Sequence, residues 1–558
     1  MNSKANVAIQ TLHGVFVQSL FTGDGKRAFQ QFADRTDIML ELPDDGVSLR
    51  GPEEVERYLL NGHWPDEQTW VISHTPAIRV DADGRSARGS WYATVFRLET
   101  DDLNWALVQG SARFDADLVL TETGWKYLRL QFYYMMTLEP NLYSDDMRPE
   151  AGHEPAFSPP EITLPDPVDF VTLSNLMGRW SADRRKGGIE LFAHQNDCAL
   201  IIPTLLDSPC LGRNSVKAGL NVLSGQEARN EPWALTIPML TTPIISVHGN
   251  SAEGIWLALT HDCKGPAFGY GKEDSYVIST LGSLKVNFLK ENGDWKIHRY
   301  EFRPHLVLPK NRILESSFDN TLLKSGWRDA PAHNPVRDEA TAASILKLEE
   351  YVSFWVSGLR YRSEAPFYYS RLAIERPDLL EHGVGVTKMA RGLDDVTHEI
   401  FAMVNKFVTF QPKAPGNHIG TTPLIELSED GERAEAVWLD YGWTTVAEVF
   451  GITRPPYKAN PAIARYHFKF IKLDGIWKVY YFNWAPFFRA GMWEFDYAKT
   501  KGWSGTTSCR RFPLPLEQYV YEHDPSRKGE KVILEPSCVP CPYEKEWTGE
   551  LDAIPSQK

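Results

Sequence analysis

A tetrapeptide that begins with Thr-Pro occurs three times in this chain, and a tryptophan follows each copy at nearly the same distance. The copies are Thr75-Pro76-Ala77-Ile78, Thr242-Pro243-Ile244-Ile245 and Thr422-Pro423-Leu424-Ile425. The tryptophans lie 16, 14 and 16 residues after the threonines, at Trp91, Trp256 and Trp438. Such a recurring pattern predicts consecutive copies of one unit rather than one large core.

Two further landmarks keep the same order around each copy. A glycine followed four residues later by a valine precedes it, at Gly51 and Val55, Gly212 and Val216, and Gly392 and Val396. A Trp-Lys pair opens an apolar run after it, at Trp125-Lys126, Trp295-Lys296 and Trp477-Lys478. The pattern predicts three modules of about 150 residues, which is an ordinary size for a single domain.

Proline-containing segments separate the expected modules. We place the first module at residues 1–146, the second at 170–326 and the third at 341–503. Residues 147–169 read as a Pro-rich linker, and residues 327–340 as a second, polar linker. The remaining residues, 504–558, are rich in proline and poor in apolar runs, which is typical of a tail that packs over the modules or is partly disordered.

The composition excludes several classes of protein. The 558 residues are 42% hydrophobic and 24% charged, as in soluble globular proteins. The net charge of −14 argues against a nucleic-acid partner, because binding phosphates requires a basic face. No apolar run reaches the roughly 20 residues that span a bilayer, and the first residues lack an apolar stretch of signal-peptide length. We therefore expect no membrane association and a cytoplasmic location.

The cysteine content does not indicate a disulfide framework or a metal site. Six cysteines are sparse for a chain of this length. Cys538 and Cys541 form a lone C-x-x-C motif, with only Cys509 and His523 near in sequence. A structural zinc needs a second pair of ligands, so reduced cysteines are the preferred interpretation and no metal is expected.

The order of helix and strand patterns predicts an α+β fold. In the first module, Ile9, Leu12 and Phe16 recur at helical spacing. A further helix opens at Gly51-Pro52-Glu53-Glu54, because proline and acidic side chains are favoured in a first turn. Four long strand patterns then follow, at residues 70–80, 87–98, 107–115 and 125–138. We expect helices laid over one face of a curved antiparallel sheet in each module.

These motifs, in this order, resemble the SnoaL-like branch of the nuclear-transport-factor-two-like superfamily. The matching segments are Phe32-Ala33-Asp34-Arg35-Thr36-Asp37, Arg50-Gly51-Pro52-Glu53-Glu54-Val55, His74-Thr75-Pro76, Asn292-Gly293-Asp294-Trp295-Lys296-Ile297 and Asp474-Gly475-Ile476-Trp477-Lys478-Val479. The resemblance extends to all three modules. It implies three tandem cone-shaped α+β barrels, each with helices that close a strongly bent sheet around an apolar pocket, followed by the Pro-rich tail.

The resemblance implies two kinds of function. Enzymes of the superfamily include polyketide cyclases, dehydratases, ketosteroid isomerases and limonene-type epoxide hydrolases, whereas other members are binding or assembly modules, so the fold does not decide the function. The dehydratases use a Tyr or Asp near the first helix and one or two His on strands that face the pocket. Removing a proton next to a carbonyl and protonating a departing hydroxyl requires a base and an acid in opposed environments.

The third module carries the fullest set of candidate residues. His418 lies close to where the family's first strand histidine falls, and Asp440 and Tyr441 follow Trp438 on the next strand. Side chains alternate along a strand, so Asp440 shares a face with Trp438 while Tyr441 points to the other. We favour Asp440 as the residue that lines the cavity, because apolar neighbours raise the pKa of a carboxyl group. The alternative is an ordinary aspartate at a strand end.

The first two modules offer fewer candidates. In the second module, His261 lies near the family's second strand histidine, and Asp183 is the nearest match to the helix acid. In the first module, His74 directly precedes Thr75-Pro76, but the helix lacks the Tyr and Asp of the enzymes. A hydrogen-bonded histidine inside the fold is the preferred interpretation of His74, and a loop histidine is the preferred one of His261.

These observations predict a cofactor-independent lyase or isomerase that acts on a hydrophobic, ring-bearing small molecule, such as a polyketide, steroid, terpenoid or aromatic catabolite. His418 would be its base and Asp440 its orienting or proton-donating carboxylate. The alternative is a non-catalytic small-molecule-binding or scaffold protein, and a weaker third reading is an epoxide hydrolase. No nucleotide, flavin or nicotinamide motif is present, so no cofactor is expected. A homodimer that pairs through its sheet surfaces is possible.

Overall fold

The computed structural model of this chain describes most of residues 2–495. The described ranges are 2–61, 69–101, 104–138, 150–151, 155–182, 188–223, 233–265, 276–308, 311–316, 331–361, 372–384, 389–396, 416–445, 457–490 and 493–495. The expected C-terminal tail, with its C-x-x-C motif, lies outside these residues. Among the described residues, none of the helices combines the length and the apolar content that a membrane span requires.

The first module folds into a six-stranded sheet with the order β2-β1-β6-β5-β4-β3. Its strands are β1 (Met39–Leu42), β2 (Val47–Arg50), β3 (Thr69–Val80), β4 (Ser86–Asp101), β5 (Asn104–Thr121) and β6 (Gly124–Leu138). Its helices are α1 (Ser3–Phe21), α2 (Gly25–Phe29), α3 (Pro52–Leu60) and the 3-10 turn η1 (Pro43–Asp45). All strand pairs are antiparallel except β1 with β6, which is parallel.

The second module repeats this strand order as β9-β8-β13-β12-β11-β10. Its elements are α4 (Pro167–Ala182), η3 (Gly188–Leu191), β8 (Ala199–Ile201), β9 (Cys210–Leu211), α5 (Arg213–Leu223), β10 (Trp233–His248), β11 (Ser251–Gly265), β12 (Tyr276–Glu291) and β13 (Asp294–Val307). Two short strands, β7 (Glu150–Ala151) and β14 (Asn311–Ser316), pair with β13 and β12.

The third module repeats the order as β16-β15-β21-β20-β19. Two short strands, β17 and β18, then take the place of the single long strand β3 or β10 of the other modules. Its elements are α7 (Glu339–Tyr361), β15 (Glu381–Val384), β16 (Met389–Arg391), β17 (Gly416–Gly420), β18 (Leu424–Leu427), β19 (Arg433–Thr445), β20 (Tyr457–Leu473), β21 (Ile476–Ala490) and β22 (Trp493–Phe495). Strand β14 also pairs with β21, and so connects the second sheet to the third.

The three sheets confirm the predicted α+β fold. The landmarks of the sequence occupy the same structural position in each sheet. Each Thr-Pro motif marks an irregularity in the first long strand of its module. The register shifts in β3 between Ser73 and Pro76, and in β10 between Thr241 and Ile244. In the third sheet the strand breaks there, between Gly420 and Leu424. Such irregularities bend a strand and increase its twist, which is how a sheet curves into a cone.

The repeated glycines have one local cause. Gly51, Gly212 and Gly392 have φ angles of 79°, 82° and 78°. This left-handed region is open to glycine and costly for residues with a Cβ. Gly51 and Gly212 immediately precede a helix that carries the repeated valine, and Gly392 is the first residue of such a helix, so the motif encodes the turn into that helix.

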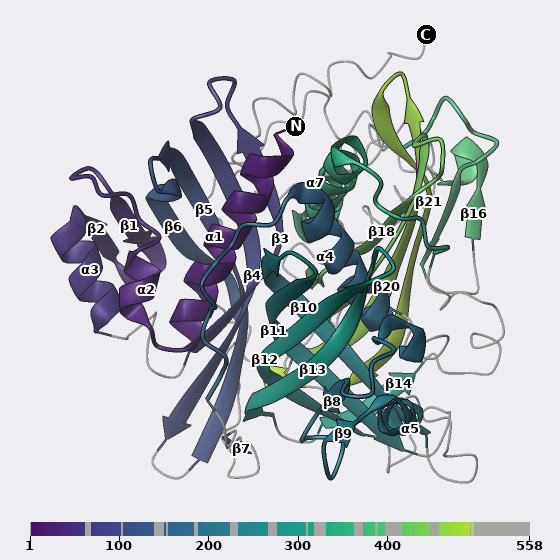
Figure 1. Cartoon of the computed structure of the whole chain (residues 1–558). Coiled ribbons are helices and arrows are strands. Elements are labelled where there is room, and N and C mark those ends of the chain that lie inside the picture. The colour runs from purple at the N-terminus through teal and green to yellow at the C-terminus, as the bar shows by residue number, and fades with distance from the viewer. Residues whose placement is uncertain are drawn as a thin grey trace, which may run out of the picture.

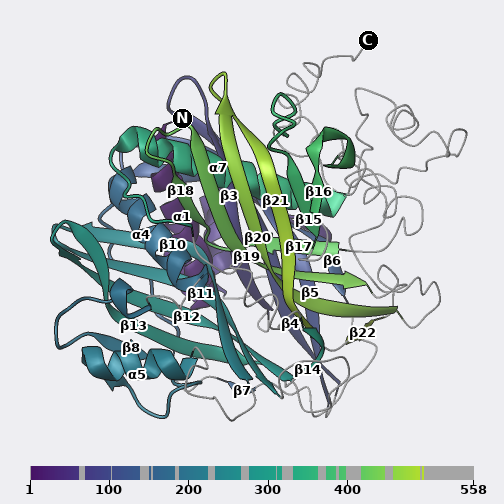
Figure 2. The ribbon, with the colours of Figure 1, turned by 90° about the vertical axis from the view of Figure 1, so that its right-hand side faces the viewer.

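The first helix of each module packs on its own sheet and on the sheet of the next module. Helix α1 contacts β3 and β10, and α4 contacts β10 and β18. Helix α7 contacts β17 and, at the other end of the chain, β3. The three helices lie together between the sheets (Figures 1 and 2). The modules therefore form a closed head-to-tail ring within one chain, the arrangement that closed heterologous interfaces produce in cyclic oligomers.

Two glycines allow these helices to approach the next module closely. A Cβ at Gly14 would lie 2.9 Å from the Ile244 side chain, and one at Gly178 would lie 2.3 Å from the Pro423 carbonyl oxygen. The backbone at Pro423 cannot move away as a flexible side chain could. Helix α4 therefore requires glycine at its contact with the third module.

The Gly178→Ala variant is expected to lose about 1–3 kcal/mol of unfolding free energy, the usual cost of overpacking a buried contact. The loss should appear as a lower urea midpoint. A matched control is Ser174→Ala on the same helix, where alanine adds no bulk. An unchanged midpoint for Gly178→Ala would contradict the close approach of α4 to Pro423.

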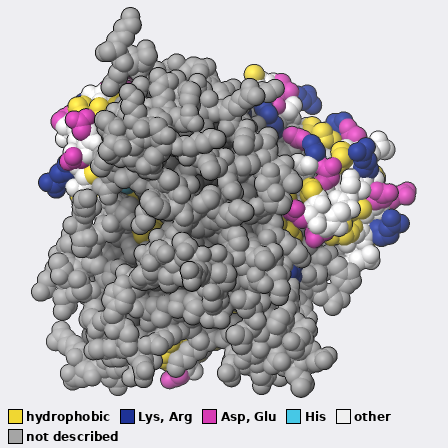
Figure 3. All heavy atoms as spheres, turned by 180° about the vertical axis from the view of Figure 1, so that it is seen from behind, with side chains coloured by type: hydrophobic (Ala, Val, Ile, Leu, Met, Phe, Trp, Pro, Cys, Tyr) yellow, Lys and Arg dark blue, Asp and Glu magenta, His cyan; other side chains and the backbone are white. Residues whose placement is uncertain are grey.

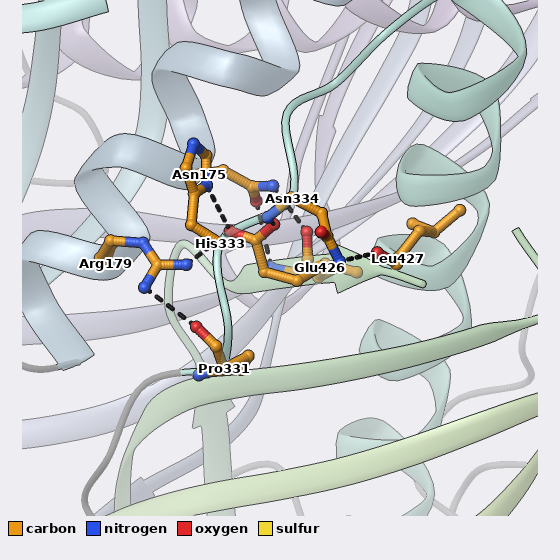
Figure 4. Close-up of polar contacts among 8 residues, drawn as sticks. Asn175, Arg179, Pro331, His333, Asn334, Glu426 and Leu427 are labelled. Carbon is orange, nitrogen blue, oxygen red and sulfur yellow. Dashed lines mark hydrogen bonds and ion pairs between the residues drawn. The ribbon is translucent and has the colours of Figure 1, made fainter. Parts of the chain in front are cut away.

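A polar cluster also fastens α4 to the third module (Figure 4). The side chain of Glu426 on β18 is 3% exposed and accepts hydrogen bonds from Arg179 Nη2 at 2.7 Å, His333 Nδ1 at 3.2 Å and the Asn334 backbone amide at 2.8 Å. The Asn175 side chain bonds to both the amide and the carbonyl of Ile425. The cluster thus joins α4, the segment before α7, and β18.

The described surface carries both signs of charge. In the view from behind, Lys and Arg side chains lie among Asp and Glu side chains at the two edges of the molecule (Figure 3).

Candidate functional site

The three modules meet at a small cleft, which we call the junction cleft. Its lining residues come from all three modules and are Gln10, His74, Pro76, Trp91, Thr241, Thr242, Pro243, Glu349 and Thr422. The free space in the cleft, its mouth included, is about 300 Å³, and the enclosed part has room for about one water molecule. The repeated Thr-Pro motifs thus come together at one point.

His74 distinguishes the first module at this point. Its side chain is 4% exposed, and its Nε2 lies 2.9 Å from Thr94 Oγ1. The residue before Thr-Pro in the other modules is a threonine, at Thr241 and Thr421. Both threonines donate their hydroxyls to a carbonyl of the neighbouring strand. A titratable ring therefore replaces a structural hydroxyl at only one of the three equivalent positions.

Glu349 supplies a carboxyl group to the cleft from α7. The residue is half-buried, and Gln10 Nε2 donates to its Oε2 at 3.3 Å. Burial raises the pKa of Glu349 to about 7, and the hydrogen bond from Gln10 opposes this rise. The carboxyl group therefore titrates closer to neutral pH than an ordinary glutamate, a condition that suits a group that must both give and take a proton.

Thr242 is held in a strained conformation at the cleft. Its φ angle is 52°, a left-handed value that is rare for a β-branched residue. Two contacts between modules hold the segment: Thr242 Oγ1 donates to the Ser73 carbonyl, and the Thr422 amide donates to the Leu240 carbonyl at 2.7 Å. Strain of this kind persists only where the surroundings enforce it, and it is commonly found at functional sites.

The interior of the first module behind the cleft is filled. Trp91 lines the cleft and stacks on the His13 ring, with centroids 3.9 Å apart. His13 Nδ1 lies 2.8 Å from the Tyr127 hydroxyl and His13 Nε2 lies 2.7 Å from Ser73 Oγ. Burial lowers the pKa of His13 well below its usual value and raises that of Tyr127. His13 is therefore neutral, with both ring nitrogens satisfied.

Part of this chain matches a known family. A family model described as a SnoaL-like domain matches residues 8–131, which span α1 to β6. Residues 8–131 form a SnoaL-like domain. A search of curated proteins gives no match.

Solved structures similar to part of this chain include nuclear-transport-factor-two-like proteins and a protein of unknown function with a cystatin-like fold. One from Salmonella enterica is 15% identical, covering 24% of this chain and 92% of its own, with a TM-score of 0.21. One with a cystatin-like fold from Novosphingobium aromaticivorans is 13% identical, covering 23% and 80%, with a TM-score of 0.19. A cystatin-like protein of unknown function from Nostoc punctiforme is 22% identical, covering 24% and 91%, with a TM-score of 0.19.

The SnoaL-like domain meets the other two modules through aromatic side chains on its outer sheet face. His261 of β11 stacks on Tyr441 of β19, with centroids 5.4 Å apart, and Phe96 of β4 lies 6.5 Å from Tyr441. His261 is 1% exposed, and burial lowers its pKa to about 3. These two predicted site residues thus lie where the three modules pack together, and His261 is neutral there.

Asp440 lies on the opposite face of β19 from Tyr441, as strand alternation predicts. It is fully buried, and Trp484 Nε1 donates to its Oδ2 at 3.0 Å. In the register of β17 with β19, Gly420 pairs with Asp440 and His418 pairs with Gly442. The His418 side chain lies outside the described residues, and so does Asp183.

Of the four predicted site residues whose side chains the structure describes, only His74 lines the junction cleft. Sequence reasoning missed Glu349, although a signal was present: it falls four residues after Ile345 and three before Val352, on the apolar face of its helix. His13 and Tyr127 carried no comparable signal. Among the described residues, no group of three or more His, Cys, Asp or Glu side chains is placed to hold a metal ion.

Proposed function

We propose that this protein is a cofactor-independent lyase or isomerase that acts on a hydrophobic, ring-bearing small molecule by general acid–base catalysis. In this proposal His74 and Glu349 are the acid–base pair, and the junction cleft receives the polar group of the substrate. The SnoaL-like fold is compatible with dehydratase or isomerase chemistry. The observation that carries the proposal is a histidine and a carboxyl group with a pKa of about 7 in one enclosed cleft.

The proposed lyase step is a proton-balanced elimination. His74 accepts the proton from a carbon next to a carbonyl, and the electron pair of the broken C–H bond forms a C=C bond. The C–O bond to the substrate hydroxyl breaks as protonated Glu349 gives its proton to that oxygen, which leaves as water. In an isomerase, the abstracted proton returns to another carbon instead. Trp91 provides the apolar surface beside the polar group.

The third module supplies a second candidate pair, His418 and Asp440, as the family resemblance implies. The burial of Asp440 beside Trp484 supports a carboxylate in an apolar interior. The two pairs make different predictions for mutants, because they lie in different parts of the ring.

A non-catalytic binding or scaffold protein is the second candidate function. The packed interior of the SnoaL-like domain favours the scaffold form of this candidate, since His13, Trp91, Phe114 and Tyr127 are each 0–1% exposed there. Pairing of two chains through their sheet surfaces stays a prediction.

The test is a thermal-shift screen against steroids, polyketides and aromatic catabolites, followed by turnover assays on the best ligands. We expect Glu349→Gln and His74→Asn each to lower kcat by about 10²–10⁴-fold, the usual contribution of a general acid or base. The matched control is Glu350→Gln, which alters the neighbouring carboxyl group that pairs with Lys347.

Each alternative has its own outcome in this assay. Normal turnover in Glu349→Gln with loss in His418→Ala would assign catalysis to the third module. Ligand binding with no turnover in the wild-type protein would favour the binding or scaffold function.

A further inference from the structure

Two of the three threonine hydroxyl groups that line the junction cleft already donate their protons to backbone carbonyls. Thr241 Oγ1 donates to the Leu257 carbonyl at 3.1 Å, and Thr242 Oγ1 donates to the Ser73 carbonyl. A hydroxyl that donates its one proton retains only lone pairs for other partners. Toward a ligand, both threonines are therefore hydrogen-bond acceptors.

The helices add further acceptors. The Gln10 side-chain amide directs its Nε2 to Asn6 Oδ1 at 2.9 Å and to Glu349 Oε2 at 3.3 Å, which leaves its carbonyl oxygen as the remaining group. Glu349 in its ionised form is an acceptor only. The cleft thus presents oxygen lone pairs from two threonines, an amide and a carboxyl group.

Thr422 is the independent indication of a ligand. It is 6% exposed, lines the cleft, and its buried hydroxyl has no hydrogen-bond partner among the described residues. A buried polar group without a partner costs about 1–3 kcal/mol. A ligand in the cleft would remove this cost.

The charge and size of the cleft limit the ligand further. No Lys or Arg is among the lining residues, and Glu349 carries negative charge above its pKa of about 7. An anionic group would therefore be repelled without compensation. Only a group about the size of one water molecule fits the enclosed part.

We infer that the junction cleft selects a small hydrogen-bond-donating group, a hydroxyl or a primary ammonium, carried on an apolar ring that remains at the mouth. This inference rests on the same cleft as the proposed function and specifies its substrate class. It excludes carboxylates and phosphates as the group that enters. The hydroxyl and the ammonium share the donor chemistry, and they differ in their response to the charge on Glu349.

The test compares four probes of similar size: benzyl alcohol, benzylamine, benzoate and toluene. Binding to the full-length protein is measured by calorimetry and thermal shift at pH 6 and pH 8. The variants are Thr422→Val, which removes the unpartnered hydroxyl, and Thr422→Ser, which keeps a hydroxyl at this position. Thr422→Val is close in shape to the native residue, and its folding is checked by circular dichroism.

We expect benzyl alcohol or benzylamine to bind, with benzoate and toluene at least tenfold weaker. Thr422→Val should weaken the preferred probe about 5- to 20-fold, as for loss of one hydrogen bond, while Thr422→Ser should retain its affinity. Tighter benzylamine binding at pH 8 than at pH 6 identifies the ammonium, and a preference for benzyl alcohol at both pH values identifies the hydroxyl.

Three results would overturn the inference. They are benzoate binding as tightly as benzyl alcohol and benzylamine or more tightly, no binding of any probe, and an affinity in Thr422→Val equal to that of the wild-type protein. These results are separate from the test of the proposed function. A donor preference can exist without turnover, and loss of kcat in Glu349→Gln can occur in a cleft that shows no donor preference.

Discussion

Replacing Glu426 with alanine is expected to lower the free energy of unfolding by about 2–3 kcal/mol. The substitution leaves Arg179, whose side chain is 19% exposed, without its carboxylate partner. It also removes the acceptor for the Asn334 amide. Breaking a buried ion pair from one side commonly costs about 3–5 kcal/mol. Because the Arg179 side chain is partly exposed, the expected loss of unfolding free energy lies at or below the lower end of that range.

The measurement is urea denaturation followed by intrinsic fluorescence, which the many tryptophans permit. The matched control is Glu429→Ala, in the turn that follows β18, because that carboxylate is 84% exposed and lies 3.7 Å from Arg337. Exposed pairs contribute only about 0–1 kcal/mol, so the control midpoint should barely move. Equal losses in the two variants would show that the polar cluster does not fasten α4 to the third module.

Glu349→Gln is expected to make the protein more stable at pH 8 and to change its stability little below pH 4.5. The folded-state pKa of about 7 lies above the ordinary value of 4.5, so the folded protein holds this proton more tightly than the unfolded chain. Stability then falls as the pH rises from 4.5 through 7, because the folded state loses a proton it binds better. Glutamine remains neutral and escapes this loss, which reaches about 3 kcal/mol at about 1.4 kcal/mol for each pKa unit.

The measurement is the difference in unfolding midpoint between Glu349→Gln and the wild-type protein from pH 5 to pH 8. Using the difference cancels the titration of groups that both proteins share. Glu350→Gln serves as the control for the removal of a neighbouring carboxyl group from the same helix. A difference that is constant with pH would mean that the Glu349 carboxyl group titrates normally in the folded protein.

The fold of each module could be predicted because its signals are local. Gly51 and its two counterparts are required by a left-handed turn before a helix, and each Thr-Pro motif marks an irregular strand. Such requirements act within a few residues, so they recur visibly when a module is copied. The closed ring could not be predicted, because it depends on contacts between distant segments, such as α7 with β3.

The candidate site was only partly predictable for the same reason. His74 could be singled out because it stands beside a recognisable motif. Glu349 comes from a helix more than 270 residues away, and only the ring brings it to the same cleft. The charge state of His261 depends on its burial against Tyr441, which belongs to a different module.

The closed ring has a consequence for how this protein can vary. In a trimer of identical subunits, any residue at the symmetry axis appears three times, so an added histidine would bring two copies of itself into the same small space. Covalent linkage removes that constraint. Here the first module places the imidazole of His74 at the centre, while the other two modules have threonine at the equivalent position. Among the lining residues, a carboxyl group comes from a helix of the third module alone. Fusion of the repeats thus permits an asymmetric centre that separate, identical subunits could not build.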